Sequence, residues 1–122
     1  MASVLTNNGE ERLVDVLVGN QTTLGSFIAW GSGAGTSDKA DTTLFTEESE
    51  SRVSGTVTKT GSAASAKYQI VGTLTASAPK TITNAGTFTL SSGGTLVLKG
   101  DFTGIVLGTG DQIVFTITAD PS

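Results

Sequence analysis

The chain has 122 residues, a formal net charge of −4, no cysteine and no histidine. Without cysteine it has no disulfides or thiol nucleophiles, and without histidine it lacks the usual general base and the commonest metal ligand. A net negative chain with scattered Lys and Arg lacks the basic patch that binds nucleic acid or anionic membranes, so we predict neither as a partner.

The N-terminal segment is predicted to form an arm over residues 1–8, followed by a short helix over 9–18. Asn7 or Asn8 can cap this helix and Gly19 can end it, although its valines leave a strand open as the alternative. The N-terminus has neither a basic segment nor a long apolar one, so we expect no secretory signal. The helix is expected to bury an apolar stripe formed by Leu13, Val14, Leu17 and Val18.

A short strand ending at Trp30 precedes a long loop over 31–51 with little periodicity. Trp30 itself is interpreted as a core residue rather than an interface anchor. The glycine-rich piece Gly31–Thr36 looks superficially like a phosphate-binding loop. The dinucleotide fingerprint needs a following helix, and polar sequence follows here, so we interpret the piece as a flexible connection.

The long loop is rich in acidic residues, whose oxygens are ligands that calcium prefers. Their spacing does not match the EF-hand loop, because the ligand run with a central glycine is missing. We therefore predict a solvated acidic loop and no metal site. The residues concerned are Asp38, Asp41, Glu47, Glu48 and Glu50.

Beyond residue 52, apolar and polar residues alternate, which predicts strands with one buried and one wet face. Antiparallel sheets allow this arrangement. Threonine is frequent on the polar parity, where its branched side chain suits a solvated sheet face. Lys99 and Asp101 also fall on that parity. The predicted inward residues are Tyr68, Ile70, Leu74, Ala76, Ile82, Phe88, Leu90, Leu96, Leu98, Phe102, Ile113, Phe115 and Ile117, with Val53 and Val57 as a weaker case.

We count six or seven strands separated by Gly, Ser and Pro turns. Two half-buried sheets are covered most simply by packing on each other. The sequence therefore predicts one all-β domain over 1–122, an antiparallel β-sandwich (jelly-roll or Ig-like) with a short N-terminal helix.

No catalytic group stands out in the sequence. A Ser or Thr nucleophile would need a lysine as its base, and none of the five lysines lies in a Ser-x-x-Lys motif. A pair of carboxylates that meet in space stays open. We predict no enzyme, no cofactor, and no catalytic, cofactor-binding or metal residues.

A succession of motifs resembles small virion structural proteins of tailed bacteriophages, a group that includes capsid decoration (cement) and tail-fibre-like proteins. The likeness covers roughly residues 9–118. The family often has Glu before the Ala-Gly pair, where this chain has Asn84. The motifs are Trp30–Thr36, Asp41–Glu47, Arg52–Thr56, Thr81–Phe88, Gly94–Phe102 and Gly110–Thr116.

The resemblance implies a non-enzymatic decoration protein, made in the host bacterial cytoplasm, that binds the outer surface of a phage head. Its partners would be the major capsid protein, whose subunit contacts it stabilises, and itself as a homo-oligomer, expected to be a trimer. The alternatives are a tail or tail-fibre component and, in another class, a carbohydrate-binding surface β-sandwich. We expect residues 1–8 and the 31–51 loop to become ordered on contact with a partner.

Overall fold

The computed structural model describes residues 3–119 and contains eight strands, one α-helix and one short 3-10 turn. The helix is α1 (Asn7–Leu17) and the turn is η1 (Ala63–Ser65). The strands are β1 (Val4–Leu5), β2 (Phe27–Gly31), β3 (Val53–Ser54), β4 (Thr56–Thr60), β5 (Lys67–Thr75), β6 (Lys80–Phe88), β7 (Leu96–Leu107) and β8 (Gln112–Ala119).

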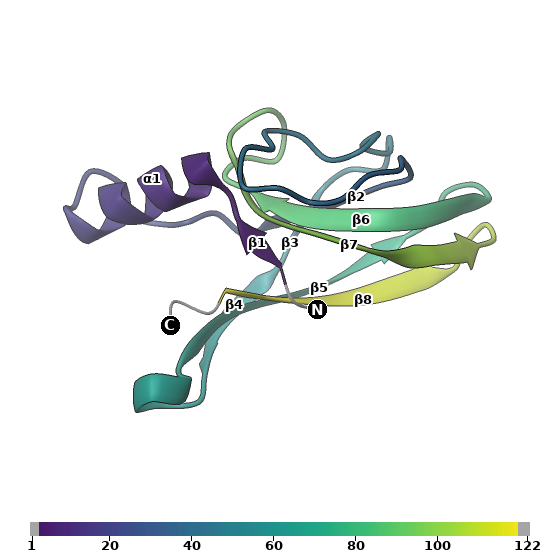
Figure 1. Cartoon of the computed structure of the whole chain (residues 1–122). Coiled ribbons are helices and arrows are strands. Elements are labelled where there is room, and N and C mark those ends of the chain that lie inside the picture. Colours follow the sequence, from purple (N-terminus) through teal and green to yellow (C-terminus); the bar gives the residue numbers. More distant parts are fainter. Residues whose placement is uncertain (1–2, 120–122) are drawn as a thin grey trace.

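The strands form two antiparallel sheets that face each other (Figure 1). The larger sheet has the order β1-β7-β6-β2-β3, and the smaller has the order β4-β5-β8. The fold is therefore the all-β, antiparallel sandwich with a short N-terminal helix that the alternating pattern predicts.

The space between the two sheets holds the main hydrophobic core. Trp30 from β2 is 1% exposed and packs edge-on against Phe115 from β8, with their ring centroids 6.3 Å apart. Trp30 is thus a core residue, as predicted. The other fully buried members of this cluster include Ile28, Ile70, Leu74, Ile82, Leu98 and Ile117.

The smaller sheet follows the predicted alternation. Leu74 and Ile117 are buried on its inner face, while Thr73 and Thr116 are exposed on its outer face. Strands β5 and β8 pair in register over eight residues, from Tyr68 opposite Ala119 to Thr75 opposite Gln112. The prediction of one buried and one wet face is confirmed for β5 and β8.

The larger sheet differs from that prediction because both of its faces are covered. Residues 84–88 of β6 and 96–100 of β7 are buried without interruption. An irregularity in the register between Ile82 and Asn84 reverses the alternation, so Phe88 lies on the outer face although Ile82, of the same parity, lies in the main core. A second apolar cluster forms there from Ala29, Leu44, Phe88 and Leu96.

Segment 31–51 covers the outer face of the larger sheet. It lies along β2 and β6 as a third layer (Figure 1). The N–H groups of Ser32 and Gly33 donate to the carbonyls of Thr46 and Phe45, at 3.1 and 2.8 Å. An isolated bridge joins Gly31 to Glu47. The alternation of apolar and polar residues reports on strands alone. It could not show that a loop would cover this face of the sheet and exclude water from it.

Helix α1 begins two residues before the predicted range of 9–18 and is capped by Thr6, so the predicted cap at Asn7 or Asn8 is wrong. The Thr6 hydroxyl accepts from the Gly9 N–H at 2.9 Å and donates to the Leu96 carbonyl at 2.6 Å. One side chain thus caps the helix and ties it to β7. Gly19, with φ of +86°, follows the last turn as predicted.

The predicted arm over residues 1–8 is not an unstructured segment where the structure describes it. Val4 and Leu5 pair with Lys99 and Leu98 of β7, and the helix starts at Asn7. Residues 1–2 lie outside the described range. β1 therefore extends the larger sheet and fixes the position of the helix start.

The predicted burial of the helix stripe is wrong. Val14, Leu17 and Val18 are 55%, 75% and 64% exposed, and Leu13 is half-buried. In Figure 1 the helix points away from the sandwich, and Gly9 is its one buried residue. The amphipathic pattern does mark an apolar face, but no layer within residues 3–119 covers it.

Candidate functional site

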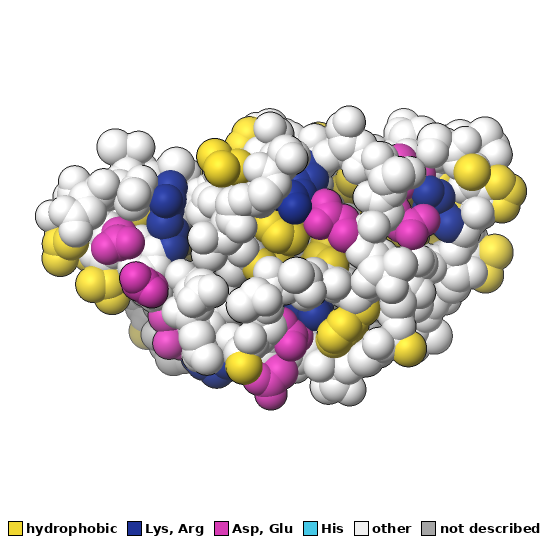
Figure 2. Space-filling model, turned by 90° about the horizontal axis from the view of Figure 1, so that it is seen from above, with side chains coloured by type: hydrophobic (Ala, Val, Ile, Leu, Met, Phe, Trp, Pro, Cys, Tyr) yellow, Lys and Arg dark blue, Asp and Glu magenta, His cyan; other side chains and the backbone are white. Residues whose placement is uncertain are grey.

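The acidic residues of segment 31–51 do not form a solvated cluster, so that prediction is wrong. Four of them face basic side chains, and Figure 2, which looks down on this layer, shows acidic and basic groups side by side. The ion pairs are Asp41–Lys99 at 3.0 Å, Glu47–Arg52 at 2.9 Å, Glu48–Lys80 at 3.2 Å and Glu50–Lys80.

Lys99 is the most deeply buried of these cations, with no exposed surface. Its Nζ donates to Asp41 Oδ2 at 3.0 Å and to the Thr43 carbonyl at 2.8 Å, and lies 3.3 Å from the centroid of the Phe45 ring. A buried ammonium is tolerated because a carboxylate, a carbonyl and a ring face replace its water. The Asp38 N–H, together with Lys99, holds the pKa of Asp41 below its ordinary value.

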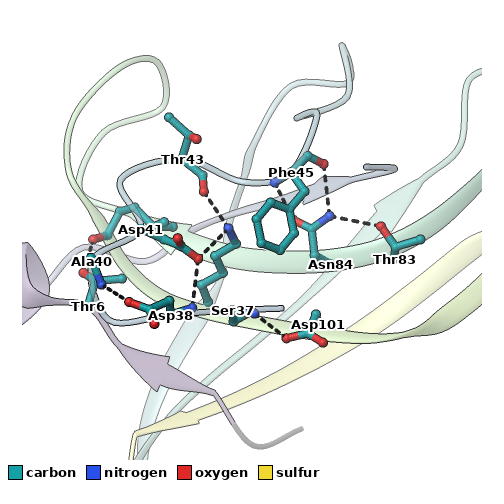
Figure 3. A network of polar contacts seen from close by, with 12 residues as sticks. Thr6, Ser37, Asp38, Ala40, Asp41, Thr43, Phe45, Thr83, Asn84 and Asp101 are labelled. Carbon is teal, nitrogen blue, oxygen red and sulfur yellow. Dashed lines mark hydrogen bonds and ion pairs between the residues drawn. The ribbon is translucent and has the colours of Figure 1, made fainter. Parts of the chain in front are cut away.

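Asn84 fastens the same segment to β6 (Figure 3). Its Oδ1 accepts from the Phe45 N–H and its Nδ2 donates to the Phe45 carbonyl, both at 3.0 Å, while Nδ2 also donates to Thr83 Oγ1 at 3.1 Å. The amide side chain thus satisfies both backbone groups of one loop residue, as a neighbouring strand would. This contact places the Phe45 ring over Lys99.

Glu50 is the centre of a third attachment. Its carboxylate accepts from Trp30 Nε1 at 3.2 Å, from the Ser77 N–H and hydroxyl at 3.0 Å each, and from Lys80. Burial alone would raise the pKa of Glu50, but the hydrogen bonds from Lys80 and Ser77 outweigh it and lower the pKa to about 2. The same bond to Glu50 raises the pKa of Lys80.

Arg52, directly after segment 31–51, anchors the C-terminal end of that segment. Its guanidinium holds Glu47 with two bonds of 2.9 and 3.0 Å and donates to the carbonyls of Leu90 and Gly93 at 2.9 and 2.6 Å. It also lies 3.5 Å from the centroid of the Phe88 ring. One side chain therefore joins the loop, the β6–β7 turn and the outer apolar cluster.

The glycine-rich piece Gly31–Thr36 is packed against the rest of the loop and is not a flexible connection. A Cβ at Gly31 would lie 2.4 Å from the Phe45 carbonyl oxygen, and one at Gly33 would lie 2.7 Å from Thr46 Oγ1. These glycines therefore allow two backbone segments to approach closely. Because the N–H groups of Ser32 and Gly33 are bonded inside the loop, they are not directed at a phosphate.

The polar groups of the loop suit anchoring rather than catalysis. Over residues 3–119, no three acidic side chains gather as a metal site. The hydroxyls of Ser32 and Ser77 donate to Glu48 and Glu50. A carboxylate with a pKa near 2 is a weak base and would not activate a hydroxyl.

The aromatic side chains are used inside the protein. All seven lie within the described residues, and each is buried or half-buried. A sugar-binding sandwich presents flat aromatic rings to its ligand. This part of the chain presents none as an exposed platform.

The candidate functional surface lies at the end of the molecule formed by α1. Val14, Leu17 and Val18 are exposed there, and Figure 2 shows hydrophobic side chains at that end. A hollow of about 620 Å³ lies beside the helix and is lined mainly by apolar side chains, among them Leu5, Leu13 and Leu24. The helical spacing of apolar residues is the sequence signal for this surface, although it predicts a buried stripe and not an exposed one.

A second hollow, of about 410 Å³, lies on the β4–β5 hairpin, which extends beyond the sandwich on the same side as α1 (Figure 1). Val57, Lys59 and Ala66 line it. Tyr68 lines both hollows, and burial raises the pKa of its hydroxyl. The helix and the hairpin therefore border one largely apolar surface.

No helix within residues 3–119 is long and apolar enough to cross a membrane. Comparison of the chain with protein-family models, with curated proteins and with solved structures gives no match.

Proposed function

We propose that this chain is a non-enzymatic virion structural protein, a decoration (cement) protein that binds the outer surface of a phage head. The observation that carries the proposal is the apolar face of α1, where Val14, Leu17 and Val18 are exposed to solvent and no other described element covers them. Exposed apolar side chains grouped on one projecting element are typical of a binding surface. The motif resemblance supplies the class of partner.

The positions of the motif residues support a structural role. Asp41 and Lys99 both lie in the motifs that resemble those of the phage proteins, and their contact holds the covering loop on the larger sheet. Asn84, where that family often has Glu, holds the same loop in this chain. Motif residues that hold a covering layer in place fit a structural role. A rigid surface loses little conformational entropy when it binds, which favours a protein that must add to an assembled shell.

Binding of this kind would stabilise a capsid by mass action. A protein that binds the assembled lattice and not the free subunits shifts the equilibrium toward the lattice. Many copies on a symmetric shell make individually weak contacts effective. The net charge of −4 also disfavours loss of the protein to nucleic acid.

The alternatives differ in how far the described residues support them. A carbohydrate-binding sandwich has no exposed aromatic platform here, so no observation favours it. A tail or tail-fibre component would use the same fold and the same exposed face, and it differs from a head protein in location and copy number.

The test is to separate phage particles that carry this chain into heads and tails on a density gradient and to quantify it by mass spectrometry. Recovery with heads, in numbers comparable to those of the major capsid protein, is the expected result. Recovery with tails at low copy number would replace the head assignment by the fibre alternative. Absence from both fractions would overturn a virion role.

A further inference from the structure

Two apolar surfaces lie at the same end of the molecule, one on a projecting helix and one in a hollow (Figure 1). Helix α1 presents a convex apolar face formed by Val14, Leu17 and Val18. The β4–β5 hairpin presents a concave one, the hollow that Val57, Lys59, Ala66 and Tyr68 line.

The inner face of the hairpin continues the core face of the smaller sheet. Val57 pairs with Ile70, and Lys59 pairs with Tyr68, so all four side chains share one face. Ile70 is fully buried within the sandwich, whereas Val57, directly opposite it on the edge strand β4, is 43% exposed. The apolar face therefore runs out of the core into solvent, where another molecule can cover it.

The charges of the two surfaces are opposite. Helix α1 carries Glu10, Glu11 and Asp15 against Arg12 alone. The sequence has no acidic residue between Glu50 and Asp101, so the hairpin carries only the basic groups Lys59 and Lys67. Glu11 lies one turn before Val14 on the helix, next to the apolar face, as Lys59 lies next to Val57.

We propose that two copies of this chain associate through these surfaces, with the apolar face of α1 from one copy seated in the hollow of the β4–β5 hairpin of the next. Glu11 then lies near Lys59 of the neighbouring copy. Because the contact joins two different surfaces, repeating it around a symmetry axis closes a ring of identical copies. This inference concerns the isolated protein, but it uses the α1 face on which the proposed capsid contact also rests. Leu17→Asp therefore affects both contacts, whereas the charge exchange and the disulfide experiment report on self-association alone.

The first experiment measures the association of the purified full-length protein by sedimentation equilibrium. Leu17→Asp places a charge at a residue that is 75% exposed, so the fold is retained while the apolar contact is lost. We expect association to weaken about tenfold or more. The matched control is Val106→Asp, at an apolar residue of β7 that is 80% exposed and lies outside both surfaces.

The second experiment tests the charge pairing. Glu11→Lys and Lys59→Glu should each weaken association by about two- to fivefold, because each places like charges together. The double variant Glu11→Lys/Lys59→Glu restores opposite charges and should recover most of the loss. Absence of recovery in the double variant would contradict the pairing.

The third experiment uses the absence of cysteine in the chain. Val18→Cys and Ala66→Cys are prepared separately, mixed and oxidised, and the disulfide-linked species is identified by mass spectrometry. The proposal predicts a link between the two variants in the mixture and little link within either variant alone. A monomeric parent protein, or association disrupted by Val106→Asp rather than by Leu17→Asp, would overturn the proposal.

Discussion

The ammonium of Lys99 lies 3.3 Å from the centroid of the Phe45 ring, although the two residues belong to different layers of the protein. Lys99 is the fourth residue of β7, and Phe45 belongs to the loop above it. The strand thus directs a charged side chain into the covering layer, and the loop supplies a carboxylate, a carbonyl and a ring to receive it. This contact makes the stability of the loop measurable by substitution.

Replacing Lys99 by Met keeps the length of the side chain and removes its charge. The Thr43 carbonyl then loses its donor and Asp41 loses its cation, so we expect the free energy of unfolding to fall by about 2–4 kcal/mol. Urea titration followed by tryptophan fluorescence measures the change. The control is Lys39→Met, whose partner Glu10 is exposed, and it should change stability by less than about 0.5 kcal/mol.

The contribution of the ring is separated by a double-mutant cycle with Phe45→Leu. This change keeps an apolar side chain and removes the quadrupole that attracts the ammonium. We expect a coupling energy of about 0.5–2 kcal/mol between the two positions. A coupling energy near zero would mean that the ring acts only by burying apolar surface.

Asn84→Leu tests the side chain that holds Phe45 in place. Leucine has a similar size but leaves the Phe45 N–H and carbonyl without partners in a buried site, so we expect a loss of about 2–4 kcal/mol. Hydrogen exchange measured by NMR should show much faster exchange of the Phe45 amide. Asn20→Leu, at an exposed position after α1, is the control and should leave that amide protected.

Gly31→Ala tests the close approach between the backbone at Gly31 and the backbone at Phe45. The added Cβ would lie 2.4 Å from the Phe45 carbonyl oxygen, a backbone atom that cannot turn away. We expect a loss of about 1–3 kcal/mol, measured by thermal or urea unfolding. Gly108→Ala, whose Cβ would lie 3.5 Å from Asp111 Oδ2, makes an ordinary contact and should be close to neutral. Equal effects at the two sites would contradict the steric explanation.

The low pKa of Glu50 makes stability depend on pH in the acid range. Its carboxylate has a pKa of about 2 in the folded protein, against an ordinary value of 4.5. The stabilisation it provides is complete above about pH 4.5 and is lost as the pH falls toward 2, in total about 3 kcal/mol. Urea titrations across this range measure the loss.

Glu50→Gln removes this titration. The variant should be less stable than the parent at neutral pH, and the difference between the two should shrink steadily as the pH falls from about 5 to 2. A constant difference between Glu50→Gln and the parent would show that the carboxylate does not carry the effect.

The fold was largely predictable because its strands obey a local rule. In β5 and β8, residues such as Leu74 and Thr73 face a core and water in turn, and each residue's position in the alternation is visible in the sequence. The same rule failed for Lys99, which stands on the polar parity and is nevertheless buried. Its environment depends on Asp41 and Phe45, more than fifty residues away, and no local pattern joins them.

The candidate site was predictable only in part for a related reason. The helical spacing of Val14, Leu17 and Val18 correctly marks an apolar face, but the pattern does not say whether that face is covered by the same chain. The prediction of a solvated acidic loop is wrong in the opposite sense, because residues predicted to be solvated are paired within the chain. The carboxylates of the loop look solvated in the sequence because their basic partners, Lys80 and Lys99, lie on later strands.

The attachments of segment 31–51 give this loop a register, as hydrogen bonds give one to a strand. Asp41, Phe45, Glu47 and Glu50 each meet a fixed partner, so inserting one residue between any two of them would pull the next side chain out of its place. Length variation should therefore concentrate at residues 34–36, which are exposed and precede these four attachments. A peptide tag placed there would leave the four attachments aligned, whereas the same tag after Asp41 would uncover Leu44 and the apolar cluster beneath it.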